Sequence, residues 1–193
     1  SQDQASFSQM VNDYLCTRRS KTEFKLITPA MIVGQKLSEF EYLYGDSLFD
    51  VGINESHATT MAAGMAVNKA DVVLLMYSTF AQRAYDQLLN DIARQDLKVI
   101  IGIDRAGVVG SDGSTHEGVY DVSMFNYMPN IKVCMPSNPS ETWSLFEYAF
   151  KQDKAIVIRY PRNNVSYNKS NIEIEELTES WKIMHDGKSA IVI

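Results

Sequence analysis

Residues suited to acid–base chemistry are concentrated in one glycine-rich stretch of the 193-residue chain, from Asp104 to Asp121 (DRAGVVGSDGSTHEGVYD). A glycine-rich loop that follows a strand lets the backbone approach a ligand where bulkier residues could not. Within it, Arg105, Asp112 and His116 supply a cation, a carboxylate and an imidazole. A purely structural connection seldom needs that mixture, so the stretch predicts a functional site.

Further side chains of this kind fall just after other predicted strands. They are Glu55, Tyr77, Phe80, Arg83, Arg159 and Arg162. In open α/β sheets, ligands bind outside the carboxyl ends of the strands, so these residues are expected to share one edge. Arginines beside carboxylates, a histidine and aromatic rings suit an anionic small molecule next to acid–base groups.

Taken singly, each of these residues has an ordinary structural explanation. Glu55 alone could be a carboxylate that complements a helix N-terminus, and Phe80 alone could belong to the core. Arg83 and Arg159 alone could be solvated or salt-bridged surface residues. Only their expected common location favours a site, and the pattern itself does not identify the ligand.

An alternation of strands and helices would position these residues. Apolar runs predict strands at residues 24–28, 49–53, 71–77, 98–103, 131–135 and 155–160. Between them, amphipathic patterns predict helices at residues 30–42, 56–67 and 119–127, another opened by Ser78 and Thr79, and one beginning at Asn138. A further helix is predicted at residues 5–19, before the first strand. This pattern predicts an α/β fold with a mainly parallel six-stranded sheet and helices on both faces.

The composition changes after residue 162. We expect residues 1–162 to form one α/β domain and residues 163–193 to form a polar linker followed by the first strand, SAIVI, of a truncated C-terminal domain. The net charge of -6 argues against nucleic acid or an anionic membrane as a partner.

The compartment is predicted from what the sequence lacks and from its thiols. It has no apolar run long enough to span a bilayer, and its first residues lack the features of a signal peptide. Cys16 and Cys134 are expected to be buried reduced thiols. A cytoplasmic location follows as the expectation.

Four segments together resemble the pyrimidine-binding domain of transketolase-type thiamine diphosphate enzymes, and among these most closely the 1-deoxy-D-xylulose-5-phosphate synthases. The segments are GINESHATTMAAGMA, MYSTFAQRAYDQLLNDIARQ, DRAGVVGSDGSTHEGVYDVSMF and VIRYPRNN. The first is shared widely in the superfamily, whereas the other three are characteristic of the synthases. The resemblance extends from about residue 28 to residue 162 and continues weakly through the linker to residue 193.

The resemblance implies thiamine diphosphate as cofactor. By position, Glu55 would hydrogen-bond the aminopyrimidine ring and promote loss of the thiazolium proton. Phe80 would stack on that ring, Arg83 would help to build the pocket, and Tyr77 would lie near the pyruvate-derived group. The cofactor would supply the carbanion chemistry, and the protein would control its protonation.

The resemblance also implies the substrates. A synthase of this family would condense pyruvate with D-glyceraldehyde 3-phosphate to 1-deoxy-D-xylulose 5-phosphate and CO2, in isoprenoid precursor synthesis. Arg105 and Arg162 match the arginines that bind the acceptor's phosphate, which suits guanidinium groups. Asp112 and His116 would handle protons or the donor carboxylate.

Two departures and one absence limit the resemblance. The motif at Glu55 reads NESHA rather than AEQHA, and RYPR is followed by Asn163 rather than glycine. The GDG motif that binds Mg2+ and diphosphate is not found, so we expect those ligands on a missing N-terminal domain. A homodimer, or a partner that carries a diphosphate-binding domain, is expected. Transketolase, a 2-oxoacid dehydrogenase β subunit and a non-catalytic subunit that retains the fold stay open as alternatives.

Overall fold

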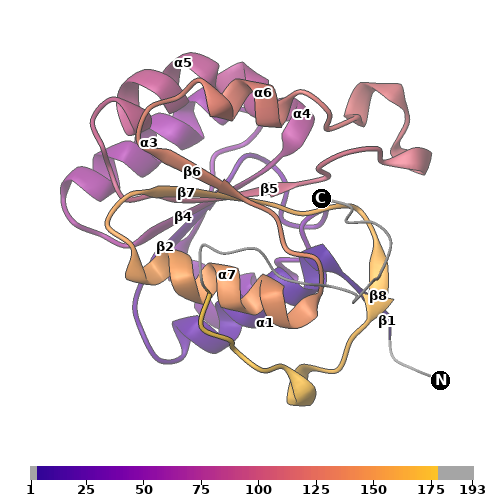
Figure 1. The fold of residues 1–193 in the computed structure, drawn as a ribbon. Coiled ribbons are helices and arrows are strands. Elements are labelled where there is room, and N and C mark those ends of the chain that lie inside the picture. Colours follow the sequence, from indigo (N-terminus) through magenta and orange to yellow (C-terminus); the bar gives the residue numbers. More distant parts are fainter. Residues whose placement is uncertain (1–3, 178–193) are drawn as a thin grey trace, which may run out of the picture.

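The computed structural model describes residues 4–177, and its central element is a six-stranded sheet (Figure 1). The strand order is β3-β2-β4-β5-β7-β6, and every neighbouring pair is parallel. The strands are β2 (Lys25–Thr28), β3 (Leu48–Asp50), β4 (Val72–Tyr77), β5 (Ile100–Asp104), β6 (Ile131–Cys134) and β7 (Ala155–Arg159). The predicted α/β class and six-stranded parallel sheet are confirmed.

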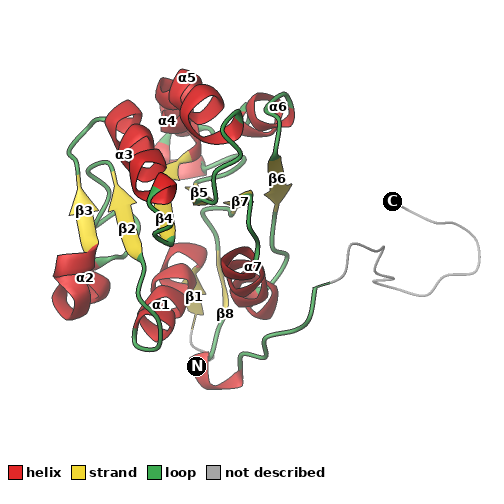
Figure 2. Cartoon of the chain, turned by 90° about the vertical axis from the view of Figure 1, so that its left-hand side faces the viewer, coloured by secondary structure: helices red, strands yellow, loops and turns green. Residues whose placement is uncertain are grey.

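Helices cover both faces of the sheet (Figures 1 and 2). On one face lie α1 (Phe7–Arg19), α2 (Ser38–Tyr44) and α7 (Pro139–Lys151). On the other lie α3 (Glu55–Val67), α4 (Ser78–Ala81), α5 (Tyr85–Gln87) and α6 (Asp121–Asn126). In β4, Val73 and Leu75 join the first core, whereas Leu74 and Met76 join the second. Burial on both sides explains why these strands are continuously apolar.

The predicted helix at residues 30–42 begins only at Ser38. Ala30 and Lys36 adopt left-handed backbone conformations, with φ of 57° and 59°. Such residues do not continue a right-handed helix. Residues 31–37 instead form consecutive turns, in which the buried amide of Gln35 accepts a 2.8 Å hydrogen bond from the hydroxyl of Thr28.

The predicted helix that follows β4 is not continuous. It divides into α4, a 3-10 turn at Gln82–Ala84, α5 and a wider π-helical segment at Leu88–Ala93. The hydroxyl of Ser56 donates to the carbonyl of Arg83 at 2.8 Å, and so occupies an acceptor that a continuous helix would use. Of the apolar positions at a spacing of four, Ala84, Leu88 and Ile92 are nevertheless fully buried, whereas Phe80 is half-buried.

The segment predicted as a linker contains a strand. Residues Asn164–Ser166 form β8, which pairs antiparallel with β1 (Gln4–Ser6) and joins the two ends of the described chain (Figure 1). A segment of three residues, Asn-Val-Ser, is too short to show the alternation that would have indicated a strand. The predicted strand SAIVI lies outside the described residues. None of the helices in residues 4–177 is long and apolar enough to cross a membrane.

Candidate functional site

The predicted site residues gather at the carboxyl edge of the sheet. Tyr77 ends β4 and pairs in register with Asp104, which ends β5. The exit of β7 is tied to the exit of β5, because the N–H of Ala106 donates to the carbonyl of Tyr160 at 3.0 Å. The loops that follow β4, β5 and β7 therefore start side by side, although they lie far apart in the sequence.

Glu55 is held at the first turn of α3. Asn54 caps this helix, since its side-chain oxygen accepts from the N–H of His57 at 3.1 Å. The Glu55 residue is only 3% exposed, and Nη1 of Arg83 donates to Oε1 at 2.9 Å. No residue within 4–177 hydrogen-bonds Oε2. The site thus offers a buried carboxyl group with one oxygen available to a ligand.

Aromatic contacts connect Glu55's partner to the glycine-rich loop. The guanidinium of Arg83 lies 4.7 Å from the centre of the Phe80 ring. Phe80 stacks on Tyr77 at 5.9 Å between centroids, and the ring of His116 meets Phe80 edge-on at 5.3 Å. Arg105 in turn lies 4.5 Å above the Tyr77 ring. This column of cations and rings joins four predicted site residues to His116.

Asp104 orients Arg105. The Asp104 carboxylate is fully buried and accepts from the Ser8 hydroxyl at 2.7 Å, from the Arg105 backbone N–H at 2.7 Å and from its guanidinium at 3.1 Å. Burial raises the pKa of Asp104, while Arg105 acts in the opposite direction. Burial likewise raises the pKa of the Tyr77 hydroxyl, against the effect of Arg105. Arg105 is left-handed, with φ of 61°, and its Nη1 also donates to Ser8 at 3.1 Å.

Arg105 and Arg162 meet on one carboxylate. Nε of Arg105 lies 3.2 Å from Oδ2 of Asp112, and Nε of Arg162 lies 3.0 Å from Oδ1 of the same residue. Both guanidinium groups therefore reach a single small anionic group. This geometry allows a phosphate to be bound by the pair, and leaves that role a prediction.

The glycine-rich loop is closed at its base. Gly107 and Gly118 exchange two backbone hydrogen bonds of 2.8 Å in an isolated antiparallel bridge. A Cβ on Gly118 would collide with the carbonyl oxygen of Arg105 and with Ser78, so this close approach requires glycine. The hydroxyl of Thr79 donates to the Thr115 carbonyl at 3.2 Å and ties the loop to α4.

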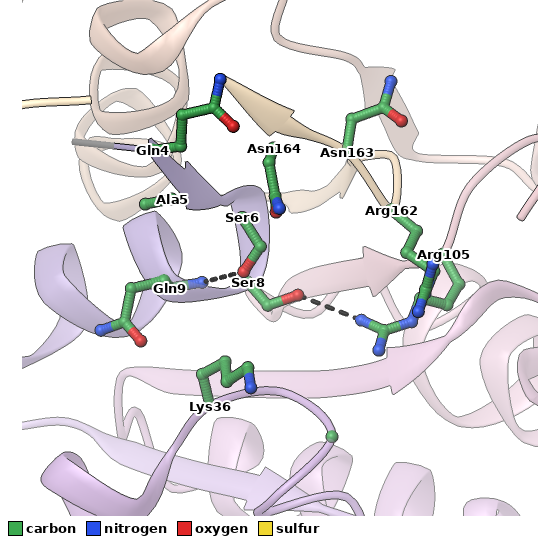
Figure 3. A pocket seen from close by; sticks show the side chains of 11 residues that line it. Gln4, Ala5, Ser6, Ser8, Gln9, Lys36, Arg105, Arg162, Asn163 and Asn164 are labelled. Atoms are coloured by element: carbon green, nitrogen blue, oxygen red, sulfur yellow. Dashed lines mark hydrogen bonds between the residues drawn. The ribbon is translucent and has the colours of Figure 1, made fainter. Parts of the chain in front are cut away.

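A pocket of about 490 Å³ opens beside the two arginines (Figure 3). It is lined by Gln4, Ala5, Ser6, Ser8, Gln9, Gly34, Lys36, Arg105, Arg162, Asn163 and Asn164. Sequence reasoning missed Ser8 and Lys36. Ser8 lies inside a helix and Lys36 in a segment predicted as helix, so neither position carried a signal.

Arg159 belongs to the scaffold. It forms a bidentate ion pair with Asp121, with hydrogen bonds of 2.9 and 3.1 Å, and so fixes the start of α6 to β7. In the part of the chain that the structure describes, no group of three or more His, Cys, Asp or Glu side chains is placed to hold a metal ion.

A family model described as the pyrimidine-binding domain of transketolase matches residues 6–168. The chain belongs to the transketolase pyrimidine-binding domain family. Two solved structures share this fold, each with a TM-score of 0.75. A split-gene transketolase, in an inactive beta4 tetramer, is 21% identical over 88% of this chain and 56% of its own. Transketolase from Pichia stipitis is 15% identical over 88% of this chain and 27% of its own.

Relatives with the name 1-deoxy-D-xylulose-5-phosphate synthase are more similar in sequence. That of Macrococcus caseolyticus is 45% identical over 97% of this chain and 30% of its own length. That of Listeria monocytogenes is 49% identical over 82% of this chain and 26% of its own. The chain therefore spans less than a third of the curated relatives it matches.

Proposed function

We propose that this chain is the pyrimidine-binding part of a thiamine-diphosphate-dependent transferase that forms 1-deoxy-D-xylulose 5-phosphate and CO2 from pyruvate and D-glyceraldehyde 3-phosphate. The observation that carries the proposal is the meeting of Arg105 and Arg162 on Asp112, at 3.2 and 3.0 Å, beside the Tyr77–Phe80 stack. The names of the relatives at 45% and 49% identity point in the same direction.

The residues around Glu55 fit an aminopyrimidine ring. A planar heterocycle needs an aromatic face and hydrogen-bonding groups at its edge, and Phe80 and Glu55 supply these from α4 and α3. Oε2 of Glu55 would share a proton with a ring nitrogen, while Arg83 holds Oε1 in place. Bound thiamine diphosphate would supply the carbanion chemistry itself.

The arginine pair would bind the acceptor. A phosphate has oxygens enough for both guanidinium groups, so the acceptor's phosphate would take Nε contacts that Asp112 holds in this structure. Asp112 and His116 would then face the acceptor and move protons during the condensation. Tyr77, whose hydroxyl pKa is raised by burial, would donate a hydrogen bond to the pyruvate-derived group.

Other parts of the proposal concern the remainder of the enzyme. Mg2+ and the diphosphate would be bound by a further domain or subunit, and the complete enzyme would be a cytoplasmic homodimer. These parts rest on the family match and on the sequence.

The direct test is reconstitution. The chain is mixed with the region of the Macrococcus caseolyticus relative that precedes its own matching segment, and product is assayed with thiamine diphosphate, Mg2+, pyruvate and glyceraldehyde 3-phosphate. We expect 1-deoxy-D-xylulose 5-phosphate only when both parts are present, and a raised KM for glyceraldehyde 3-phosphate in Arg162→Met. Ketol transfer from a sugar phosphate without CO2 release would contradict the proposal and indicate a transketolase instead.

A further inference from the structure

We propose that Lys36 is a third anion-binding side chain of the pocket and contacts the acceptor's phosphate together with Arg105 and Arg162. The inference rests on the proposed function and deepens it. None of the four motif segments contains Lys36, and its predicted place was an ordinary helix position.

Lys36 shares the pocket with both arginines. All three side chains line the cavity of about 490 Å³. Figure 3 shows Lys36 and Arg162 on different walls, with Ser8 and Arg105 between them. An anion that enters this cavity is therefore approached by cations from separate segments of the chain, the turn before α2 and the exits of β5 and β7.

Lys36 contributes a positive charge that no carboxylate of the pocket balances. Arg105 pairs with Asp104 and Asp112, and Arg162 pairs with Asp112. Two carboxylates therefore already balance the two guanidinium groups. Lys36 forms no ion pair with any residue in 4–177. Its ammonium is the charge that leaves the pocket net positive, which a phosphate dianion requires for strong attraction.

The backbone at Lys36 is held in an uncommon conformation. Its φ of 59° is left-handed, as is that of Arg105 at 61°. A residue with a Cβ pays for this conformation unless the surroundings fix it, and such residues cluster at ligand-binding sites. Two of the three pocket cations thus carry the same unusual backbone geometry.

Neighbouring contacts fix the turn that presents Lys36. The N–H of Gln35 donates to the carbonyl of Met31 at 2.9 Å, and that of Leu37 donates to Ile32 at 2.8 Å. Leu37 is fully buried. Gly34 packs so closely on the hydroxyl of Tyr77 that a Cβ there would collide with it. The Cα of Lys36 is consequently fixed relative to Tyr77, the ring beneath Arg105.

The test uses inorganic phosphate as the probe. It is titrated into the complete chain, and binding is followed by amide chemical shifts for the wild type, Lys36→Met, Lys36→Arg and Arg162→Met. Lys69→Met is the matched control, because Lys69 is also an exposed left-handed lysine, with φ of 61°, but follows α3 outside the pocket. We expect about a tenfold loss of affinity in Lys36→Met, a smaller loss in Lys36→Arg and no change in Lys69→Met.

The possible outcomes separate this inference from the proposed function. If Arg162→Met weakens phosphate binding and Lys36→Met does not, the role of Lys36 is wrong and the phosphate site stands. If the wild type binds no phosphate, both are wrong. Equal losses in Lys36→Met and Lys69→Met would indicate a general charge effect and overturn the inference. Lys36→Gly is the second variant. It relieves the left-handed strain, so it should melt no lower than the wild type and still lose affinity.

Discussion

At the scale of single residues, Glu55 and Arg83 show how the site keeps a buried carboxylate. Glu55 is 3% exposed, and the one partner of its carboxylate in the described chain is the Arg83 guanidinium 2.9 Å away. Arg83 also covers Phe80, so one side chain serves both the carboxylate and the ring. Sequence position identified these residues individually. The ion pair between them could not be predicted, because it depends on the broken helix after β4.

Removal of Arg83 should therefore destabilise the fold, because it leaves the buried Glu55 carboxylate without its ion-pair partner. Arg83→Met should lower the free energy of unfolding by about 1–2 kcal/mol, because a desolvated carboxylate loses its partner. Adding Glu55→Gln should recover most of that loss, because burying an uncharged amide costs less free energy than burying an unpaired carboxylate. Urea unfolding of the wild type, both single variants and the double variant measures the coupling. Strictly additive losses would contradict it.

A thiol provides a pH test that is independent of the site. Burial raises the pKa of Cys16 to about 12. In the native chain at pH 8 its thiolate fraction should be negligible, and alkylation should modify the half-buried Cys134 first. The raised pKa also means that the stability contributed by Cys16 is fully present below about pH 9 and is lost as the pH rises towards 12. Mass spectrometry of alkylated peptides checks the order, and equal rates for both thiols would contradict it.

At the scale of elements, the sheet was predictable and several connections were not. The strands β4, β5 and β7 are buried on both faces. Such strands appear in the sequence as short continuous apolar runs, and this made them predictable. The turns before α2 depend on left-handed residues that the apolar pattern does not reveal. Strands β1 and β8 depend on a pairing between two three-residue segments far apart in the chain, and segments this short hold no local signal.

The glycine-rich loop should respond to one added methyl group. Gly118→Ala should weaken phosphate binding about tenfold or more, because its Cβ would displace the Arg105 carbonyl. Gly64→Ala is the control. Gly64 lies within α3 with open space around its Cβ position, so that change should stabilise the chain by about 0.5–1 kcal/mol and leave phosphate binding intact. Calorimetric titration of both variants would decide, and unchanged binding in Gly118→Ala would contradict the assigned role of the loop.

At the scale of the whole molecule, the pocket is assembled from both ends of the described chain. In open α/β sheets, ligands bind outside the carboxyl ends of the strands. From this rule the sequence predicted that Arg105, Asp112 and Arg162 would lie at one edge of the sheet. It could not predict Ser8 or Asn164, which reach the pocket through α1 and the β1–β8 pair. Those contributions exist only once the sheet has formed and its ends have met.

Deletion of residues 1–6 should weaken ligand binding in the pocket while the fold is retained. It removes β1 and three pocket-lining residues, and leaves α1, whose Tyr14 packs against Trp143 and Phe146 of α7. We expect a cooperative thermal transition a few degrees lower and phosphate binding weakened several-fold. Loss of the cooperative transition would show that the β1–β8 pair is required for the fold itself.

The proposed role of Glu55 in the protonation of bound thiamine diphosphate is measured most directly by hydrogen–deuterium exchange at the thiazolium carbon. The chain is reconstituted with the preceding region of the Macrococcus caseolyticus relative, and exchange is compared between the wild type and Glu55→Gln at saturating cofactor. We predict that Glu55→Gln folds and still binds the cofactor. Exchange at the thiazolium carbon should be slower by roughly 100-fold or more, because an amide does not share that proton. Equal exchange rates in the two proteins would remove Glu55 from the mechanism.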